Sequence, residues 1–183
     1  MFIKVKELEL RKLEFDEKLS PGIIDLGADI AQTAPLEAVG RAELVREHRG
    51  ARHSVEDIRL VGRLATEIEV RCARCLEPVA NKVAESFDLI YRPQGVDAVG
   101  DEQSISTAET EIGYYQGEGL LLEDVLKEQV LLALPVKQVC SPGCKGLCPQ
   151  CGTNLNTAGC DCTAAMPDPR WAALEDIRKK LEQ

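Results

Sequence analysis

Eight cysteines constrain this 183-residue chain more than any other feature of its sequence. They occur in close pairs, two of which are CxxC pairs, in CARC at 72–75 and CPQC at 148–151. Two residues between thiolates allow both sulfurs to approach one ion at about 2.3 Å, as tetrahedral zinc requires. With the four further cysteines, two complete sites are possible. The sequence therefore predicts two structural Zn²⁺ ions, whose ligands would be Cys72, Cys75, Cys140, Cys144, Cys148, Cys151, Cys160 and Cys162.

The division of the eight cysteines between two sites is open from sequence, because the fold decides which pairs meet. Neighbourhood favours one site from Cys148, Cys151, Cys160 and Cys162, which lie within fifteen residues. Cys140 and Cys144 would then join Cys72 and Cys75 and close a loop of more than sixty residues. The alternative brings the two CxxC pairs together in one ribbon-like site.

Redox chemistry and catalysis are weaker interpretations of the same residues. A redox CxxC opens a helix in a βαβ unit, and no such pattern surrounds Cys72. A catalytic zinc usually keeps an open coordination position, whereas cysteine can supply every ligand here. His48 and His53 lie in a stretch rich in Arg and Glu, where solvated histidines are expected. We therefore expect no enzyme activity and no small-molecule substrate.

The compartment and the membrane can also be judged from the sequence. No apolar run approaches the roughly 18 residues that a membrane span needs, and the first ten residues lack the apolar core of a signal peptide. These features predict a cytoplasmic protein that does not enter a membrane. Thiols stay reduced in that compartment, so metal binding is favoured over disulfides.

Apolar residues at period two predict that the first half of the chain is mainly sheet. Residues 1–15 fit a half-buried strand with bulges, and residues 20–35 fit a loop. Three further strands follow between Leu36 and Tyr91, of which Ile58–Val70 alternates most clearly. An antiparallel meander with one buried and one exposed face is the expected arrangement.

The second half of the chain is expected to carry helices and a cysteine-rich segment. Residues 120–134 have helical spacing, with acidic residues in the first turn and Pro135 as the stop. Residues 94–119 read as a long acidic loop, and a short helix should begin at Asp168-Pro169. The predicted class is α+β: a curved antiparallel sheet or small open barrel with one packed helix. The predicted domains are 1–135, a zinc-binding tail at 136–165 and a C-terminal helix at 166–183.

Several segments together resemble a known family. They are CARCLEP at 72–78, LLLEDVLKEQVLLALPV at 120–136, CSPGCKGLCPQCGTNLN at 140–156 and CDC at 160–162. In order and spacing they resemble the YceD-like family, which is named for large ribosomal RNA subunit accumulation. The resemblance implies a cytoplasmic bacterial factor for accumulation or processing of 23S ribosomal RNA in ribosome biogenesis, acting by binding or assembly.

Charge limits how such a protein could meet RNA. The net charge is −9, and residues 94–134 hold nine acidic residues against one basic. Arginine is concentrated in residues 41–74, where it outnumbers the acids by eight to six, and its planar fork suits phosphate. The candidate RNA-binding residues on the exposed sheet face are Arg41, Arg46, Arg59, Arg63, Arg71 and Arg74.

Other interpretations of these charges remain open. The arginines could belong to an ordinary solvated sheet face. The chain could be an adaptor whose acidic loop recruits basic ribosomal proteins without contacting RNA. A thiol-regulated chaperone is a third hypothesis, and it would require activity gained on zinc release.

Overall fold

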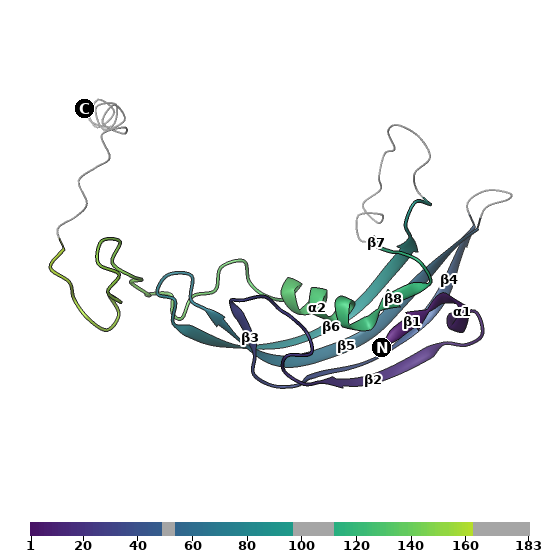
Figure 1. The fold of residues 1–183 in the computed structure, drawn as a ribbon, viewed down its shortest axis with the longest axis horizontal. Coiled ribbons are helices and arrows are strands. Elements are labelled where there is room, and N and C mark those ends of the chain that lie inside the picture. Colours follow the sequence, from purple (N-terminus) through teal and green to yellow (C-terminus); the bar gives the residue numbers. More distant parts are fainter. Residues whose placement is uncertain (49–53, 97–111, 163–183) are drawn as a thin grey trace, which may run out of the picture.

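A computed structural model describes residues 1–48, 54–96 and 112–162 of the chain. Its main element is an open six-stranded sheet in the order β2-β4-β5-β6-β7, with β3 paired to β5 outside that order (Figure 1). The strands of this sheet are β2 (Leu13–Leu19), β3 (Ile30–Gln32), β4 (Leu36–His48), β5 (Ser54–Arg71), β6 (Pro78–Pro93) and β7 (Ile112–Tyr115).

The long strands β4, β5 and β6 form the predicted antiparallel meander. The alternation expected of Ile58–Val70 is confirmed: Ile58, Leu60, Leu64 and Ile68 are buried, while Arg63, Glu67 and Glu69 on the opposite parity are exposed. Successive side chains of a strand point to opposite faces, so the sheet has an inner apolar face and an outer solvated face.

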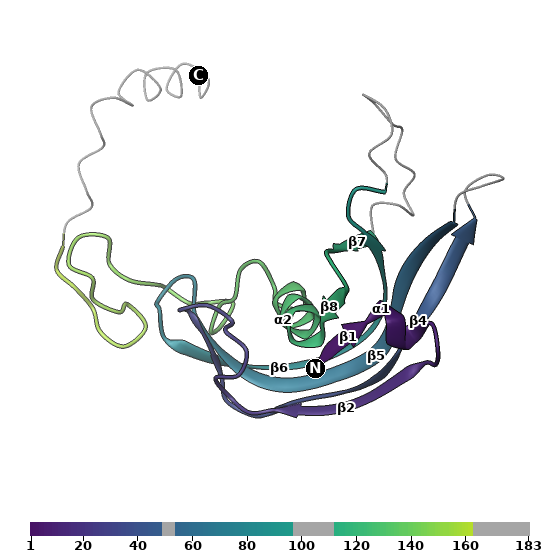
Figure 2. The same cartoon turned by 45° about the vertical axis from the view of Figure 1, so that its right-hand side comes forward.

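A helix and a two-stranded ribbon cover the inner face. The helix α2 (Leu122–Leu132) buries Leu122, Val125, Leu126 and Val130, and these join the core of the sheet. The ribbon pairs β1 (Phe2–Lys4) with β8 (Gly119–Leu121). Figure 2 shows α2, β1 and β8 on the concave side of the long strands. In the described ranges, both helices are too short and too polar to cross a membrane.

The predicted helix at 120–134 and the predicted strand at 1–15 are both shorter in the structure. The helix begins at Leu122 because the two preceding residues belong to β8. Residues 1–15 contain β1, the helical turn α1 (Val5–Leu8) and the start of β2. The slips in period two are thus one turn of helix, in which Glu9 N–H donates to the Val5 carbonyl at 3.0 Å. Leu10 is 86% exposed, which a half-buried strand would not allow.

Two other segments differ from the expected loops. The predicted loop at 20–35 contains β3, and the predicted acidic loop at 94–119 contains β7. Strand β7 runs parallel to β6, so the sheet is not wholly antiparallel. Residues 97–111 and the helix expected from Asp168 lie outside the described residues.

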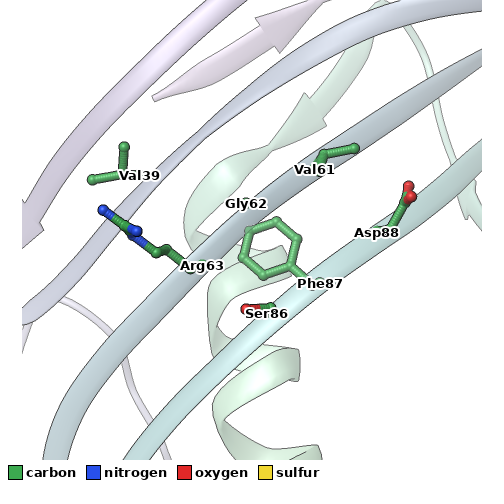
Figure 3. A pocket seen from close by; sticks show the side chains of 7 residues that line it. All are labelled: Val39, Val61, Gly62, Arg63, Ser86, Phe87 and Asp88. Carbon is green, nitrogen blue, oxygen red and sulfur yellow. The ribbon is translucent and has the colours of Figure 1, made fainter.

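A row of four residues crosses the middle of the sheet. The register aligns Phe15 with Gly40, Gly40 with Gly62, and Gly62 with Phe87. A Cβ on Gly40 would lie 2.6 Å from the Phe15 ring and 2.4 Å from the Val61 carbonyl oxygen. A Cβ on Gly62 would lie 2.8 Å from the ring of Phe87, which lies beside it in Figure 3. The two glycines thus leave the space that the two buried rings fill.

Candidate metal centres

The eight cysteine sulfurs form two separate groups. Cluster I consists of Cys72, Cys75, Cys140 and Cys144, and cluster II consists of Cys148, Cys151, Cys160 and Cys162. Within each cluster all four sulfurs lie within 4.8 Å of one another. This grouping follows sequence neighbourhood, and the two CxxC pairs do not meet in one site.

Sulfur separations in cluster I suit a tetrahedral ion. Sγ of Cys72 is 3.9 Å from Sγ of Cys144, and Sγ of Cys75 is 3.6 Å from Sγ of Cys140. A tetrahedron with zinc about 2.3 Å from each sulfur has an edge of about 3.8 Å. A disulfide would need about 2.05 Å. The thiols are free, and their arrangement fits a soft divalent cation.

The two CxxC pairs fold into the same turn. In the first, Cys72 N–H donates to the Glu77 carbonyl at 2.8 Å and Leu76 N–H donates to the Cys72 carbonyl at 3.0 Å. In the second, Cys148 N–H donates to the Thr153 carbonyl at 2.8 Å and Gly152 N–H donates to the Cys148 carbonyl at 2.9 Å. The two CxxC segments therefore form the same type of turn, with the same backbone hydrogen bonds. The first joins β5 to β6, so the ends of two long strands position it.

Backbone and side-chain donors bind the second half of cluster I to the first. The N–H groups of Arg74 and Cys140 approach Sγ of Cys72 at 3.5 and 3.4 Å. Ala73 N–H donates to the Gln138 carbonyl at 2.8 Å, and Nη1 of Arg74 donates to the carbonyls of Pro142 and Cys144. These hydrogen bonds hold residues 138–144 against the turn between β5 and β6. The N–H groups that approach Sγ of Cys72 would also stabilise its thiolate form.

The clusters differ in exposure. Cys72, Cys75 and Cys144 are buried and form a small apolar cluster with Val79, Val139 and Leu147. In cluster II only Cys148 is buried, and both Cys151 and Cys162 are exposed. Cys140 of cluster I is exposed as well, so a metal ion in cluster I would be partly enclosed, whereas one in cluster II would be more open to chelators.

The thiols of the two clusters differ widely in pKa. Hydrogen bonds from backbone N–H groups, that of Cys75 first, lower the pKa of Cys72 to about 6. The Thr153 side chain is the main cause that lowers the pKa of Cys151 to about 6. For Cys162 the hydrogen bond with Cys151 is the first cause that raises the pKa, to about 12. The raised pKa of Cys162 follows from its closeness to the other thiols, and a divalent cation bound there would favour the thiolate instead.

Leu76, in the first CxxC turn, has an unfavourable backbone conformation. Its φ is +62°, a left-handed conformation, and Gly152 occupies the equivalent position with φ +72°. Such a conformation costs an L-residue about 1–2 kcal/mol, and the Leu76 side chain is 54% exposed. The surrounding hydrogen bonds therefore hold Leu76 where glycine would be unstrained.

Substitution at Leu76 should reveal that strain. We expect Leu76→Gly to change the unfolding free energy by less than about 1 kcal/mol, because relief of strain offsets lost contacts and added chain entropy. Leu76→Val should destabilise by roughly 1–2 kcal/mol, since β-branched residues tolerate positive φ worst. Denaturant unfolding of the metal-loaded proteins measures both. Equal stability of Leu76→Val and the unaltered chain would contradict the turn geometry.

The six candidate RNA-binding arginines do not share one role. Arg46 and Arg59 form ion pairs with Glu56 and Asp88, the second through two hydrogen bonds of 2.8 and 2.6 Å. Arg71 lies 3.9 Å from Asp29, and Arg74 donates to the cluster I loop as described above. Arg41 and Arg63 are exposed and form no ion pair within the described residues.

Arg63 is exposed on the outer face of β5. It lies between Val39 and Ser86 in the strand register, and its guanidinium extends toward Val39 in Figure 3. Val39 is 42% exposed, and the pocket there is also lined by Val61 and Asp88. The cationic surface on the outer face is therefore small, and carboxylates such as that of Asp88 lie within it. His53 and the side chain of His48 lie outside the described part of the chain.

Two asparagines near the clusters were not identified as site residues from the sequence, which indicated only a turn at 154–156. Nδ2 of Asn156 lies 3.3 Å from Sγ of Cys144, and Nδ2 of Asn154 donates to Glu77 Oε1 at 3.2 Å. The first contact reaches cluster I itself, and the second reaches the turn that carries Cys72 and Cys75. The available signal was the CGTNLN segment, where two amide side chains follow a metal-type turn.

Comparison with known proteins finds a family match that spans both clusters. The family model described as large ribosomal RNA subunit accumulation protein YceD matches residues 60–178, which include both clusters. The chain belongs to the YceD family. No solved structure matches this YceD-family chain.

Similar proteins occur in bacteria and in plants. An uncharacterized protein of Mycobacterium bovis is 35% identical over 129 residues, covering 67% of this chain and 56% of the relative. The chloroplastic YCED homolog 1 of Arabidopsis thaliana, called a large ribosomal RNA subunit accumulation protein, is 24% identical over 147 residues, covering 69% and 46%. YlbN of Bacillus subtilis is 22% identical, covering 98% and 96%. The match thus spans about half the length of the first two relatives.

Proposed function

We propose that this YceD-family chain is a non-enzymatic factor for accumulation or processing of large-subunit (23S) ribosomal RNA, held in shape by two structural zinc ions. The observation that carries the zinc is the convergence of eight thiols into two groups of four. All-cysteine tetrahedral sites are typical of structural zinc, since no coordination position is left open. The family description and the name of the plant relatives support the ribosomal RNA role.

The zinc ions would organise the segment that follows the helix. Residues 136–162 carry little apolar material, and the last helix or strand in the described part of the chain ends at Leu132. Zinc binding coupled to folding is worth on the order of 10 kcal/mol in small modules. We therefore place a metal-organised tail after a sheet domain, acting in the cytoplasm on the large-subunit RNA or a pre-ribosomal particle.

Metal analysis tests the zinc part directly. Protein purified without a chelating tag should contain two zinc ions per chain, and dialysis against a strong chelator should empty cluster II before cluster I because cluster II is more exposed. One ion per chain would mean that only one cluster is a site. No bound metal would refute the proposal.

The RNA part can be tested at Arg63. If the outer face meets RNA, Arg63→Glu should weaken binding to transcripts of large-subunit ribosomal RNA about tenfold and reduce the salt slope by about one. Arg63 is preferred to Arg59 or Arg74, whose substitution would also break contacts within the protein. The measurement is salt-titrated crosslinking of the purified, zinc-loaded protein.

A matched charge reversal distinguishes contact from general electrostatics. Lys6→Glu, on the exposed side of α1, alters the net charge equally and should leave RNA binding within about twofold. Equal losses in both variants would argue against a contact at Arg63.

A second candidate function is an adaptor that recruits basic ribosomal proteins without contacting RNA. The observation that favours it is the pairing of Arg46 and Arg59 with carboxylates, which leaves a small cationic surface. In that case RNA crosslinking would be weak even at low salt, while a basic ribosomal protein would bind and be released by salt.

A further inference from the structure

The side chain of Asn156 links the two metal clusters. Asn156 belongs to the segment between Cys151 and Cys160, which cluster II would close into a loop. Its side chain nevertheless reaches a sulfur of cluster I, since Nδ2 lies 3.3 Å from Sγ of Cys144. Ligands of one site and a hydrogen-bond donor to the other are thus carried by the same short segment.

The hydrogen bonds of Asn156 fix the direction in which its amide points. Lys145 N–H donates to Oδ1 of Asn156 at 2.8 Å, so the oxygen must face the backbone and the nitrogen must face the sulfur. The second N–H of Nδ2 donates a hydrogen bond to Oδ1 of Asn154 at 2.9 Å. Every polar atom of this amide has a partner, and its orientation is determined.

The segment that carries Asn156 is itself attached to the first turn. Leu147 N–H donates to the Arg74 carbonyl at 3.1 Å, and Leu155 N–H donates to the Gly146 carbonyl at 2.9 Å. Leu147 and Asn154 form an antiparallel bridge. A Cβ on Gly146 would lie 3.0 Å from the Arg74 carbonyl oxygen, so the approach is close. Movement of the cluster II loop would therefore displace the residues around cluster I.

We propose that Asn156 couples the two clusters, so that metal in cluster II strengthens metal binding at cluster I by fixing an N–H···S hydrogen bond to Cys144. The inference rests on the proposed zinc binding and adds that each site affects the metal affinity of the other. Groups that orient metal ligands typically change affinity 10–100-fold when removed. Coupling between binding sites is reciprocal, so metal in cluster I must strengthen cluster II by the same factor. Loss of metal from exposed cluster II would then loosen buried cluster I.

The test measures the affinity of cluster I with and without cluster II. In Cys151→Ser/Cys162→Ser, which disables cluster II at its two exposed cysteines, zinc affinity of cluster I should fall about tenfold by competition with a chromophoric chelator. Asn156→Asp should cause a similar fall with both clusters present. The combined variant should lose no more than either alone, because both changes remove the same hydrogen bond.

A spectroscopic readout separates this role from a loss of folding. With ¹¹³Cd in place of zinc, each tetrathiolate site gives its own NMR resonance, and the cluster I resonance should shift in both variants while remaining occupied. Gln116→Glu makes an equivalent amide-to-carboxylate exchange at an exposed position between β7 and β8, and should leave the cluster I affinity and resonance unchanged.

The outcomes separate the two proposals. Absence of metal in the unaltered chain would refute zinc binding itself. Two bound ions, with cluster I unaffected by the loss of cluster II, would overturn the coupling alone. That comparison does not depend on residue 156, so it can overturn the coupling even if Asn156→Asp does not fold.

Discussion

Cys72→Ser should lower the zinc content from two ions per chain to one and should expose residues 136–147 to solvent exchange. Cys72 is fully buried, and its sulfur receives the N–H groups of Arg74 and Cys140. A serine hydroxyl is a poor zinc ligand, and a site with three thiolates loses much of a binding energy that is on the order of 10 kcal/mol in small zinc modules. Metal analysis and hydrogen–deuterium exchange measure the two effects.

Two companion variants define this prediction. Ala73→Ser introduces the same residue one position along the exposed turn and should retain two zinc ions. Cys162→Ser removes a ligand from exposed cluster II and should also leave one ion, but with smaller effects on exchange near the sheet, because no cluster II cysteine lies between two strands of the sheet. If Cys72→Ser retained two ions, cluster I would not be a metal site.

Gly40→Ala should destabilise the sheet by roughly 2–3 kcal/mol. The new Cβ would lie 2.4 Å from the Val61 carbonyl oxygen and 2.8 Å from the Gly62 Cα, both of which belong to the neighbouring strand. Backbone atoms in the middle of a paired ladder cannot move aside locally, so the strain spreads into the core. Denaturant unfolding with both metal sites filled measures the loss.

The control for Gly40 is a glycine with open space. A Cβ on Gly143 would meet nothing within 4 Å, so Gly143→Ala should stay within about 0.5 kcal/mol of the unaltered chain. Adding Phe15→Leu to Gly40→Ala should recover little, because the ring accounts for only one of the three close contacts. Full recovery would place the conflict in the ring rather than in the backbone.

The features that sequence predicted well are those set by local periodicity. The alternation of Ile58 to Ile68 requires one buried face, and the spacing of Leu122, Val125, Leu126 and Val130 requires one buried helical face. The family resemblance, drawn from the cysteine motifs and the helix segment, is also confirmed. Two CxxC turns with further cysteine pairs close by restrict the possible groupings, so the convergence of the sulfurs was accessible.

The features that sequence did not predict depend on contacts between distant segments. Strand β8 exists because it pairs with β1 across the chain, and this pairing moves the start of α2. The partners of Arg59 and Arg74 come from β6 and from the loop before Cys144. Nothing local distinguishes such arginines from Arg41 and Arg63, so charge counting could not separate the paired arginines from the two without an ion pair.

The position of cluster I in the chain has a consequence for biosynthesis. Its first two ligands sit between β5 and β6, whereas Cys140 and Cys144 come after β7, β8 and α2. A ribosome making this protein releases every strand of the sheet before the last two of these thiols. The sheet can thus fold before cluster I is complete. A metal ion bound early by Cys72 and Cys75 would have only these two protein ligands until Cys140 and Cys144 are synthesised.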